Sequence, residues 1–248
     1  MFQRAVKITI LLFIMASIVL AATAQDQPPE GPTITHQAAY PDIQMTFTEV
    51  QLIIDFEPGA GFPLHTHGGP TLALVLDGEI TLRQNGTDTV YRAGESWTET
   101  PADVHTAFNA SDAPARVLAT FLLPPGAEAL TPEADAEMPA VAPAITYQAV
   151  FPDITMDGIF SENQAVLEFQ PGAGIPPHVH GGPTLALVLD GEITLRQNGE
   201  DVIYTAGQSW TEMPGDVHEA FNSGDTPAHV VATFLLPPGA EATTLQSN

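Results

Sequence analysis

Short stretches in which apolar and polar residues alternate recur along this chain, separated by glycine-containing turns. Residues 79–83 alternate in this way and lead into Asn85-Gly86, a dipeptide typical of a tight β-hairpin turn. Residues 71–76 (TLALVL) are apolar or small on both faces, which indicates a strand covered by a second sheet or by another domain. After residue 30 no stretch has the periodicity of a long amphipathic helix. The pattern predicts an all-β fold.

The second half of the chain repeats the first. Residues 65–131 align with residues 178–244 without a gap, and the two segments differ at 15 of 67 positions. Shorter matches before them, at 40–43 and 151–154, show that the second copy has gained two residues before Gly172. A repeat of this length is a whole domain rather than one unit of a solenoid.

The repeat defines the expected domain organisation. We expect two β domains, at 35–130 and 146–240, joined by a linker at 131–145 that is rich in Ala, Pro and Glu. Residues 25–34 would form a linker before the first domain, and residues 241–248 a C-terminal tail.

The N-terminus has the features of a secretory signal peptide at residues 1–24. Arg4 and Lys7 precede an apolar run at 8–20, and residues 22–24 (ATA) provide a small-residue cleavage site. We therefore expect export, to the periplasm or as a secreted protein, with no membrane association after cleavage. The alternative is an uncleaved membrane anchor, because the apolar run is near the lower length limit for spanning a bilayer.

Charge and composition narrow the classes of function. The chain has 30 Asp and Glu against 6 Lys and Arg, a formal net charge of −24 at pH 7. A surface this acidic repels phosphate backbones, so we expect no nucleic-acid partner. The chain contains no cysteine, which excludes disulfides, thiol catalysis and cysteine-ligated metal sites.

Six histidines occupy matching positions of the two copies: His65, His67 and His105, then His178, His180 and His218. The first two of each set are separated by one residue, so on a strand their imidazoles would point to the same face. The third comes from a later strand and would complete one face of a coordination sphere. Imidazole is a ligand for Fe, Zn, Mn and Cu. The sequence therefore predicts one divalent metal ion per domain, without choosing among these metals.

The spacing of these residues resembles the two motifs of the cupin family. The residues that match are Gly59, His65, His67 and Gly78 for the first motif, and Gly94, Pro101, His105 and Asn109 for the second. The pattern recurs in the second copy, from Gly172 to Asn222. The resemblance covers essentially all of both domains, so the chain is similar to a bicupin. It implies two tandem double-stranded β-helix (jelly-roll) barrels, each with its metal inside, packed as an intrachain pseudo-dimer.

One departure from the family concerns the metal ligands. Cupins commonly carry a glutamate three or four residues after the His-x-His pair, whereas this chain has Thr71 and Thr184 there. Because a threonine hydroxyl is a poor ligand for a divalent ion, we expect a neutral three-histidine site.

A carboxylate from another strand is the alternative. Trp97 and Glu99 would share one face of the strand before His105, and Trp210 and Glu212 repeat this arrangement in the second copy. If that face is inward, each glutamate would be a fourth ligand or a catalytic base, and each tryptophan a pocket wall. If it is outward, the glutamates point to solvent.

Several functions are compatible with this sequence. The first is a metal-dependent dioxygenase-type oxidoreductase that acts on a small organic molecule, since the resemblance includes iron dioxygenases with three-histidine sites. The second is a non-catalytic module that binds a metal or a small ligand, and the third is a zinc hydrolase or hydratase. Because cupins support many chemistries, the fold does not choose between an enzyme and a binding protein.

Overall fold

The structure is a computed structural model that describes residues 31–43, 46–156 and 158–246. These residues contain strands and turns but no helix, and the all-β prediction is confirmed. Within the described ranges, accordingly, no helix is long and apolar enough to cross a membrane. The predicted signal peptide, residues 1–24, lies outside them.

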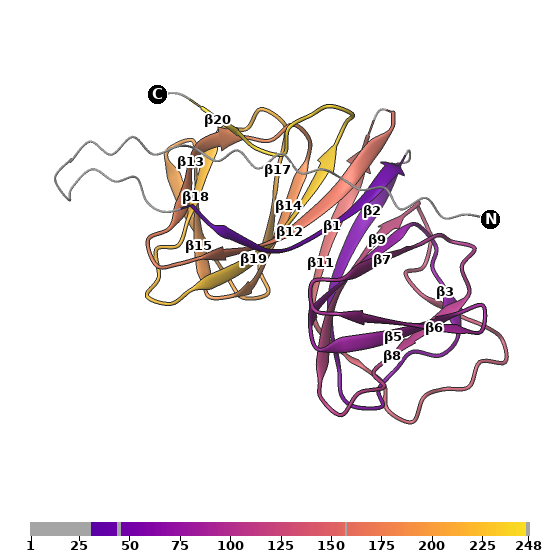
Figure 1. The fold of residues 1–248 in the computed structure, drawn as a ribbon. Coiled ribbons are helices and arrows are strands. Elements are labelled where there is room, and N and C mark those ends of the chain that lie inside the picture. The colour runs from indigo at the N-terminus through magenta and orange to yellow at the C-terminus, as the bar shows by residue number, and fades with distance from the viewer. Residues whose placement is uncertain (1–30, 44–45, 157, 247–248) are drawn as a thin grey trace.

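The described residues form four five-stranded antiparallel sheets, two for each of two barrels (Figure 1). In the first barrel, one sheet has the strand order β11 (Ala144–Thr155), β2 (Thr46–Phe56), β9 (Ala115–Leu123), β4 (Thr71–Asp77), β7 (Ser96–Glu99). Its other sheet has the order β10 (Thr131–Pro132), β3 (His65–Thr66), β8 (His105–Phe108), β5 (Glu79–Gln84), β6 (Thr87–Arg92). In the second barrel, one sheet has the strand order β1 (Thr33–Ile43), β12 (Phe160–Phe169), β19 (Ala228–Leu236), β14 (Thr184–Asp190), β17 (Ser209–Glu212). Its other sheet has the order β16 (Glu200–Thr205), β15 (Glu192–Gln197), β18 (His218–Phe221), β13 (Gly174–Val179), β20 (Thr244–Leu245).

The predicted hairpin turn is present in both copies. Asn85 and Gly86 both have positive φ, 52° and 73°, as a two-residue type I′ turn requires. They connect β5 to β6, whose register pairs the residues on either side of the turn, Gln84 and Thr87. Asn198 and Gly199 repeat this arrangement between β15 and β16.

The two copies exchange their first strands. β1, from the first copy, pairs with β12 of the second barrel, and β11, from the second copy, pairs with β2 of the first. Figure 1 shows indigo β1 beside the orange strands of the second barrel. The predicted domain ranges, 35–130 and 146–240, follow the two copies of the repeat and stay a prediction. In space, each barrel includes one strand of the other copy. The predicted linkers also form strands: residues 33–34 begin β1, residues 131–132 form β10, which pairs with β3, and residues 144–145 begin β11. Ile34 is therefore counted with the first copy and Ile145 with the second, as are the strands that they begin.

The barrels pack through the sheets that contain β4 and β14. On β4 the side chains of Leu72 and Leu74 belong to an apolar cluster shared by both barrels, whereas Ala73 and Val75 belong to the interior of the first barrel. The prediction that this strand is covered on both faces is confirmed. Phe47 and Phe160 stack across the same interface, with ring centroids 5.5 Å apart. The two copies thus form an intrachain pseudo-dimer.

The centre of this interface is polar. Six buried side chains lie there: Glu49, Gln51 and Thr120 from the first copy, and Glu162, Gln164 and Thr233 from the second. Gln51 Nε2 donates to Thr233 Oγ1 at 2.9 Å, and Gln164 Nε2 donates to Thr120 Oγ1, so these hydrogen bonds join the two copies reciprocally. No lysine, arginine or histidine is among the six.

Candidate metal centre

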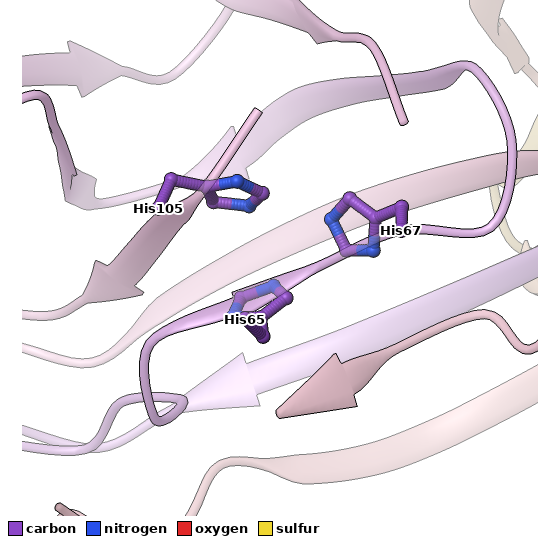
Figure 2. Close-up of side chains that lie close together, drawn as sticks. All are labelled: His65, His67 and His105. Carbon is purple, nitrogen blue, oxygen red and sulfur yellow. The ribbon is translucent and has the colours of Figure 1, made fainter. Parts of the chain in front are cut away.

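The three histidines of the first copy come together inside the barrel. β3 lies beside β8, and His65 is directly opposite His105 in this pairing. His67 follows two residues after His65, and Figure 2 shows the three rings turned toward one another. One ring nitrogen of each lies within 4.8 Å of the corresponding nitrogens of the other two. All three side chains are buried.

The second copy repeats this arrangement. His178 on β13 is directly opposite His218 on β18, and His180 completes the set. Their ring nitrogens also lie within 4.8 Å of one another, and the three side chains are buried. Each barrel therefore contains one three-histidine group that is able to hold a metal ion.

Backbone carbonyls fix the tautomer of every ring. In the first copy the Nδ1 atoms of His65, His67 and His105 lie 2.7, 2.6 and 3.1 Å from the carbonyl oxygens of Pro63, Ala129 and Asp103. In the second copy the corresponding carbonyls belong to Pro176, Ala242 and Asp216. A carbonyl can only accept, so each Nδ1 carries a proton and each Nε2 is left for a ligand.

Glu99 and Glu212 face inward and contact these histidines. Glu99 Oε2 lies 2.9 Å from His67 Nε2, and Glu99 Oε1 lies 2.9 Å from His105 Nε2. Trp97 Nε1 donates to Glu99 Oε1 at 2.6 Å, which holds the carboxylate in place. Glu212 makes the equivalent contacts with His180, His218 and Trp210. The inward orientation of the two glutamates agrees with the structure, whereas the solvent-facing alternative does not.

The carboxylate and the rings shift one another's pKa values. Burial by itself would raise the pKa of Glu99, but the hydrogen bonds and charge attraction of His105 and His67 outweigh it and lower the pKa to about 2. Burial lowers the pKa of His65 to about 4, and repulsion by His105 and His67 adds to this. The pKa of Glu212 is likewise lowered to about 2, and that of His178 to about 4. At neutral pH, His65 and His178 are therefore neutral ligands beside an anionic carboxylate.

The donor set fits a divalent metal ion. Because each Nδ1 is protonated, the Nε2 atoms of His67 and His105 present lone pairs toward the oxygens of Glu99 unless these rings gain a second proton, and His180 and His218 do the same toward Glu212. A proton or a metal ion between the Nε2 atom and the carboxylate oxygen removes the repulsion between their lone pairs. His218 Nε2 is buried and lacks an aligned hydrogen-bond partner, although Glu212 Oε1 is 3.0 Å away. Three imidazoles and one carboxylate are ligands that Fe, Zn and Mn share.

The neutral site expected from Thr71 and Thr184 needs correction. In the register of β4 and β7, Thr71 is directly opposite Glu99, and in the second copy Thr184 is opposite Glu212. Directly opposite residues share one face of a sheet. The neighbouring strand thus supplies a carboxylate beside the position where the family's glutamate is expected. This is the inward-facing alternative that the sequence offered through Trp97 and Glu99, and the strand pairing decides for it.

Two glycines after His67 lie where the backbone approaches another part of the chain closely. A Cβ atom on Gly68 would lie 2.5 Å from the carbonyl oxygen of Glu128, and one on Gly69 would overlap the carbonyl oxygen of Leu122. The chain between β3 and β4 therefore passes directly against backbone of the same barrel. Gly181 and Gly182 meet the equivalent backbone atoms in the second copy.

Replacing Gly69 with alanine is expected to lower the free energy of unfolding by about 1–3 kcal/mol, because the added methyl group must displace backbone. Denaturant unfolding of the full chain measures this. Gly31→Ala is the matched control, since its added methyl group meets nothing within 4 Å. Equal stability of the two variants would contradict the close approach.

Each histidine group forms part of the wall of an internal cavity. The cavity of the first barrel has a volume of about 450 Å³ and that of the second about 440 Å³. Trp97 and Phe121 line the first, and Trp210 and Phe234 line the second. A space of this size admits a small organic molecule beside the histidines.

The sequence did not predict the backbone carbonyls that orient the rings of His67 and His180. Ala129 and Ala242 lie in the segments that follow the last long strand of each copy, 62 residues after the histidines they contact. A backbone carbonyl has no side-chain signal, so no residue pattern could have indicated it.

Comparisons with known proteins support this fold. The sequence profile of the cupin domain matches the chain twice, over residues 52–121 and 165–234. No sequence among the curated proteins matches the chain. AerE from Microcystis aeruginosa has a similar structure, with a TM-score of 0.54 and 16% identity, over 84% of this chain and 99% of that chain.

Oxalate decarboxylase from Bacillus subtilis is also similar in structure. A mutant of that enzyme has a TM-score of 0.58 and 13% identity, over 89% of this chain and 81% of that chain. A further structure, concerned with the Mn(II) centres of the same enzyme, has a TM-score of 0.54 and 13% identity, with the same coverage. At this identity the likeness shows the fold alone.

Proposed function

The chain belongs to the cupin family, with two cupin domains in tandem, and we propose that it is an exported, metal-dependent oxidoreductase of the dioxygenase type. Its substrate would be a small organic molecule. The observation that carries the proposal is the set of three histidines and one glutamate beside a cavity, present in both barrels. The N-terminal pattern of basic residues, apolar run and small-residue site supports export.

Four side chains of each barrel would hold the ion. In the first barrel these are His65, His67 and His105 through Nε2, with Glu99 as the fourth ligand. A bound divalent ion would supply Lewis acidity and, if it is redox-active, electron transfer to oxygen. The Mn(II) centres of the similar oxalate decarboxylase support an ion of this class, although the donor set here also suits Fe, Zn or Cu. The cavity would exclude water and place the substrate beside the ion.

Elemental analysis is the first test. Protein purified without a histidine tag and without added metal is expected to contain up to two ions per chain. The chain would then be reconstituted anaerobically with Fe(II), and oxygen uptake measured with diketones, thiols and flavonoids. Fully loaded protein that consumes no oxygen with any of them would refute the oxidoreductase. Stabilisation by a ligand without turnover would instead support the binding module, and ester or CO₂ hydration with zinc the hydrolase or hydratase.

Replacing Glu99 with glutamine tests the role of the carboxylate. As a fourth ligand, Glu99 is expected to be needed for full occupancy, so Glu99→Gln should lower the metal content of the first barrel while the fold is retained. A catalytic base would give a different result: unchanged metal content, with turnover at the first site reduced by about 10²–10⁴ when the second site is disabled by His218→Ala. The metal content of Glu57→Gln, an exposed glutamate outside the cavity, is the control.

A further inference from the structure

The two cavities are lined mostly by apolar side chains. In the first barrel the apolar lining includes Leu52, Ile54, Phe62 and Ala119. In the second it includes Leu167, Phe169, Ile175 and Ala232. The ionisable side chains among the lining residues are His65, His67, His105 and Glu99 in the first cavity. In the second they are His178, His180 and Glu212.

Neither cavity contains an arginine or lysine among its described lining residues. The four arginines of the described chain are on the surface and pair with acidic residues: Arg83 with Asp88, Arg92 with Glu79, Arg116 with Asp55 and Arg196 with Asp201. A divalent ion on three neutral histidines and one glutamate would leave each site with a single net positive charge, which a monoanion balances. A dianion would bring one negative charge more, with no arginine or lysine in the lining to balance it. Burying such a charge without a partner is unfavourable.

The exchanged strands complete the cavity walls. Ile145 on β11 is directly opposite Ile54 of β2, a residue that lines the first cavity, and it lines that cavity too. Ile34 on β1 is directly opposite Leu167 of β12 and lines the second cavity. The two isoleucines are 57% (Ile34) and 54% (Ile145) exposed, so they lie where each cavity meets solvent. Each cavity thus has an apolar residue at its entrance that belongs to the opposite copy.

We propose that each cavity takes an uncharged or singly charged molecule with an apolar body and one metal-binding group, and that the isoleucine of the opposite copy helps to select that body. The metal-binding group would lie at the histidines, and this part rests on the proposed function. The apolar body would lie along the wall that the exchanged strand completes. Ile145 then acts on the site of His65, and Ile34 on the site of His178. A short dianion such as oxalate is excluded as the preferred ligand.

Calorimetry with matched ligands tests the class of substrate. In Co(II)-loaded full chain, affinity is expected to rise about fourfold for each added methylene along acetate, butyrate and hexanoate. Oxalate is expected to bind more weakly than hexanoate. The absorption spectrum of Co(II) in the same sample shows whether the carboxylate reaches the metal. Equal affinities along the series, or tighter binding of oxalate, would overturn the proposal.

The test separates failure of the cavity from failure of the metal site. If the chain does not bind Co(II), the proposed function fails, and 1-butanol and 1-hexanol are then titrated into the metal-free chain. The same rise in affinity per methylene would support the apolar cavity, and its absence would overturn it. Filling the first cavity by Ala119→Leu is expected to remove hexanoate or hexanol binding there while Co(II) binding is retained.

Crossed variants test the contribution of the exchanged strands. With the second cavity filled by Ala232→Leu, Ile145→Ser is expected to weaken hexanoate binding about fivefold, whereas Ile34→Ser should leave it unchanged. With the first cavity filled by Ala119→Leu, the two results should be reversed. Each variant is therefore the matched control of the other. The assignment would be overturned if the isoleucine variant in the same copy as the open cavity weakened hexanoate binding, or if neither variant did.

Discussion

Replacing His105 with alanine is expected to reduce the bound metal from two ions per chain to one. The ring of His105 provides one of three Nε2 atoms and also contacts Glu99, so its removal leaves an incomplete ligand set in the first barrel. The second barrel has its own set and should keep its ion. His105→Ala combined with His218→Ala is expected to remove both. Elemental analysis of untagged protein, with circular dichroism as a check of the fold, measures these results.

His229→Ala is the matched control for this experiment. His229 lies on the surface, where its Nδ1 atom is 2.7 Å from Asp190 Oδ1, and it is not part of either cavity. Its replacement is expected to leave two ions per chain. A control variant that loses as much metal as His105→Ala would show that the ions bind elsewhere.

Raising the pH from 5 to 8 is expected to lower the free energy of unfolding, because two buried carboxyl groups keep their protons in the folded protein at pH values where the unfolded chain releases them. Burial raises the pKa of Glu49 from its ordinary value of 4.5 to about 8, despite the hydrogen bond from Gln51. Burial, and then the charge of Glu49, raises the pKa of Glu162 well above its ordinary value. A carboxyl group whose pKa is raised on folding stabilises the protein most below its unfolded pKa, and this stability is lost as the pH rises through the folded pKa.

The hydrogen-bond partners of these two groups fit the neutral form that burial favours. Glu49 Oε1 accepts from Gln51 Nε2 at 2.7 Å, while Glu49 Oε2 and Gln51 Oε1 have no partner. Glu162 Oε2 and Gln164 Oε1 are in the same situation. A protonated carboxyl group supplies the donor that each of these pairs lacks. Between the unfolded and folded pKa values, each carboxyl group is expected to cost about 1.4 kcal/mol of stability per pH unit.

The double variant Glu49→Gln, Glu162→Gln isolates this contribution. Glutamine has nearly the same shape, cannot ionise and carries an amide donor that an ionised carboxylate lacks. The free energy of unfolding of the double variant is therefore expected to exceed that of the parent chain at pH 8, with a smaller difference at pH 5. Exposed glutamates replaced in the same way, Glu57→Gln with Glu133→Gln, are the control. A difference that does not change with pH would rule out neutral buried acids.

Much of the fold could be predicted from the sequence because its signals are local. Alternation of apolar and polar residues fixes which side of a strand is buried, and Asn85-Gly86 fixes a turn through positive φ at both residues. The two-residue spacing of His65 and His67 places both rings on one face, and the structure brings His105 to the same place. The repeat then required a second barrel with the same histidines.

The rest depended on which strands become neighbours. The pairing of β4 with β7 decided that Glu99 lies beside Thr71, and so that a carboxylate borders the histidines. Pairings of β1 with β12 and of β11 with β2 decided that Ile34 and Ile145 line the cavity of the opposite copy. The same packing buried Glu49 against the second barrel.

The sequence by itself therefore determined the strands, the repeat and the six histidines, since each follows from residues close together along the chain. Only the tertiary structure decided the charge beside those histidines, the walls of the cavities and the state of the buried glutamates. Those properties depend on contacts between strands far apart in sequence. No local pattern encodes such contacts, because two nearly identical copies offer each strand two equivalent partners.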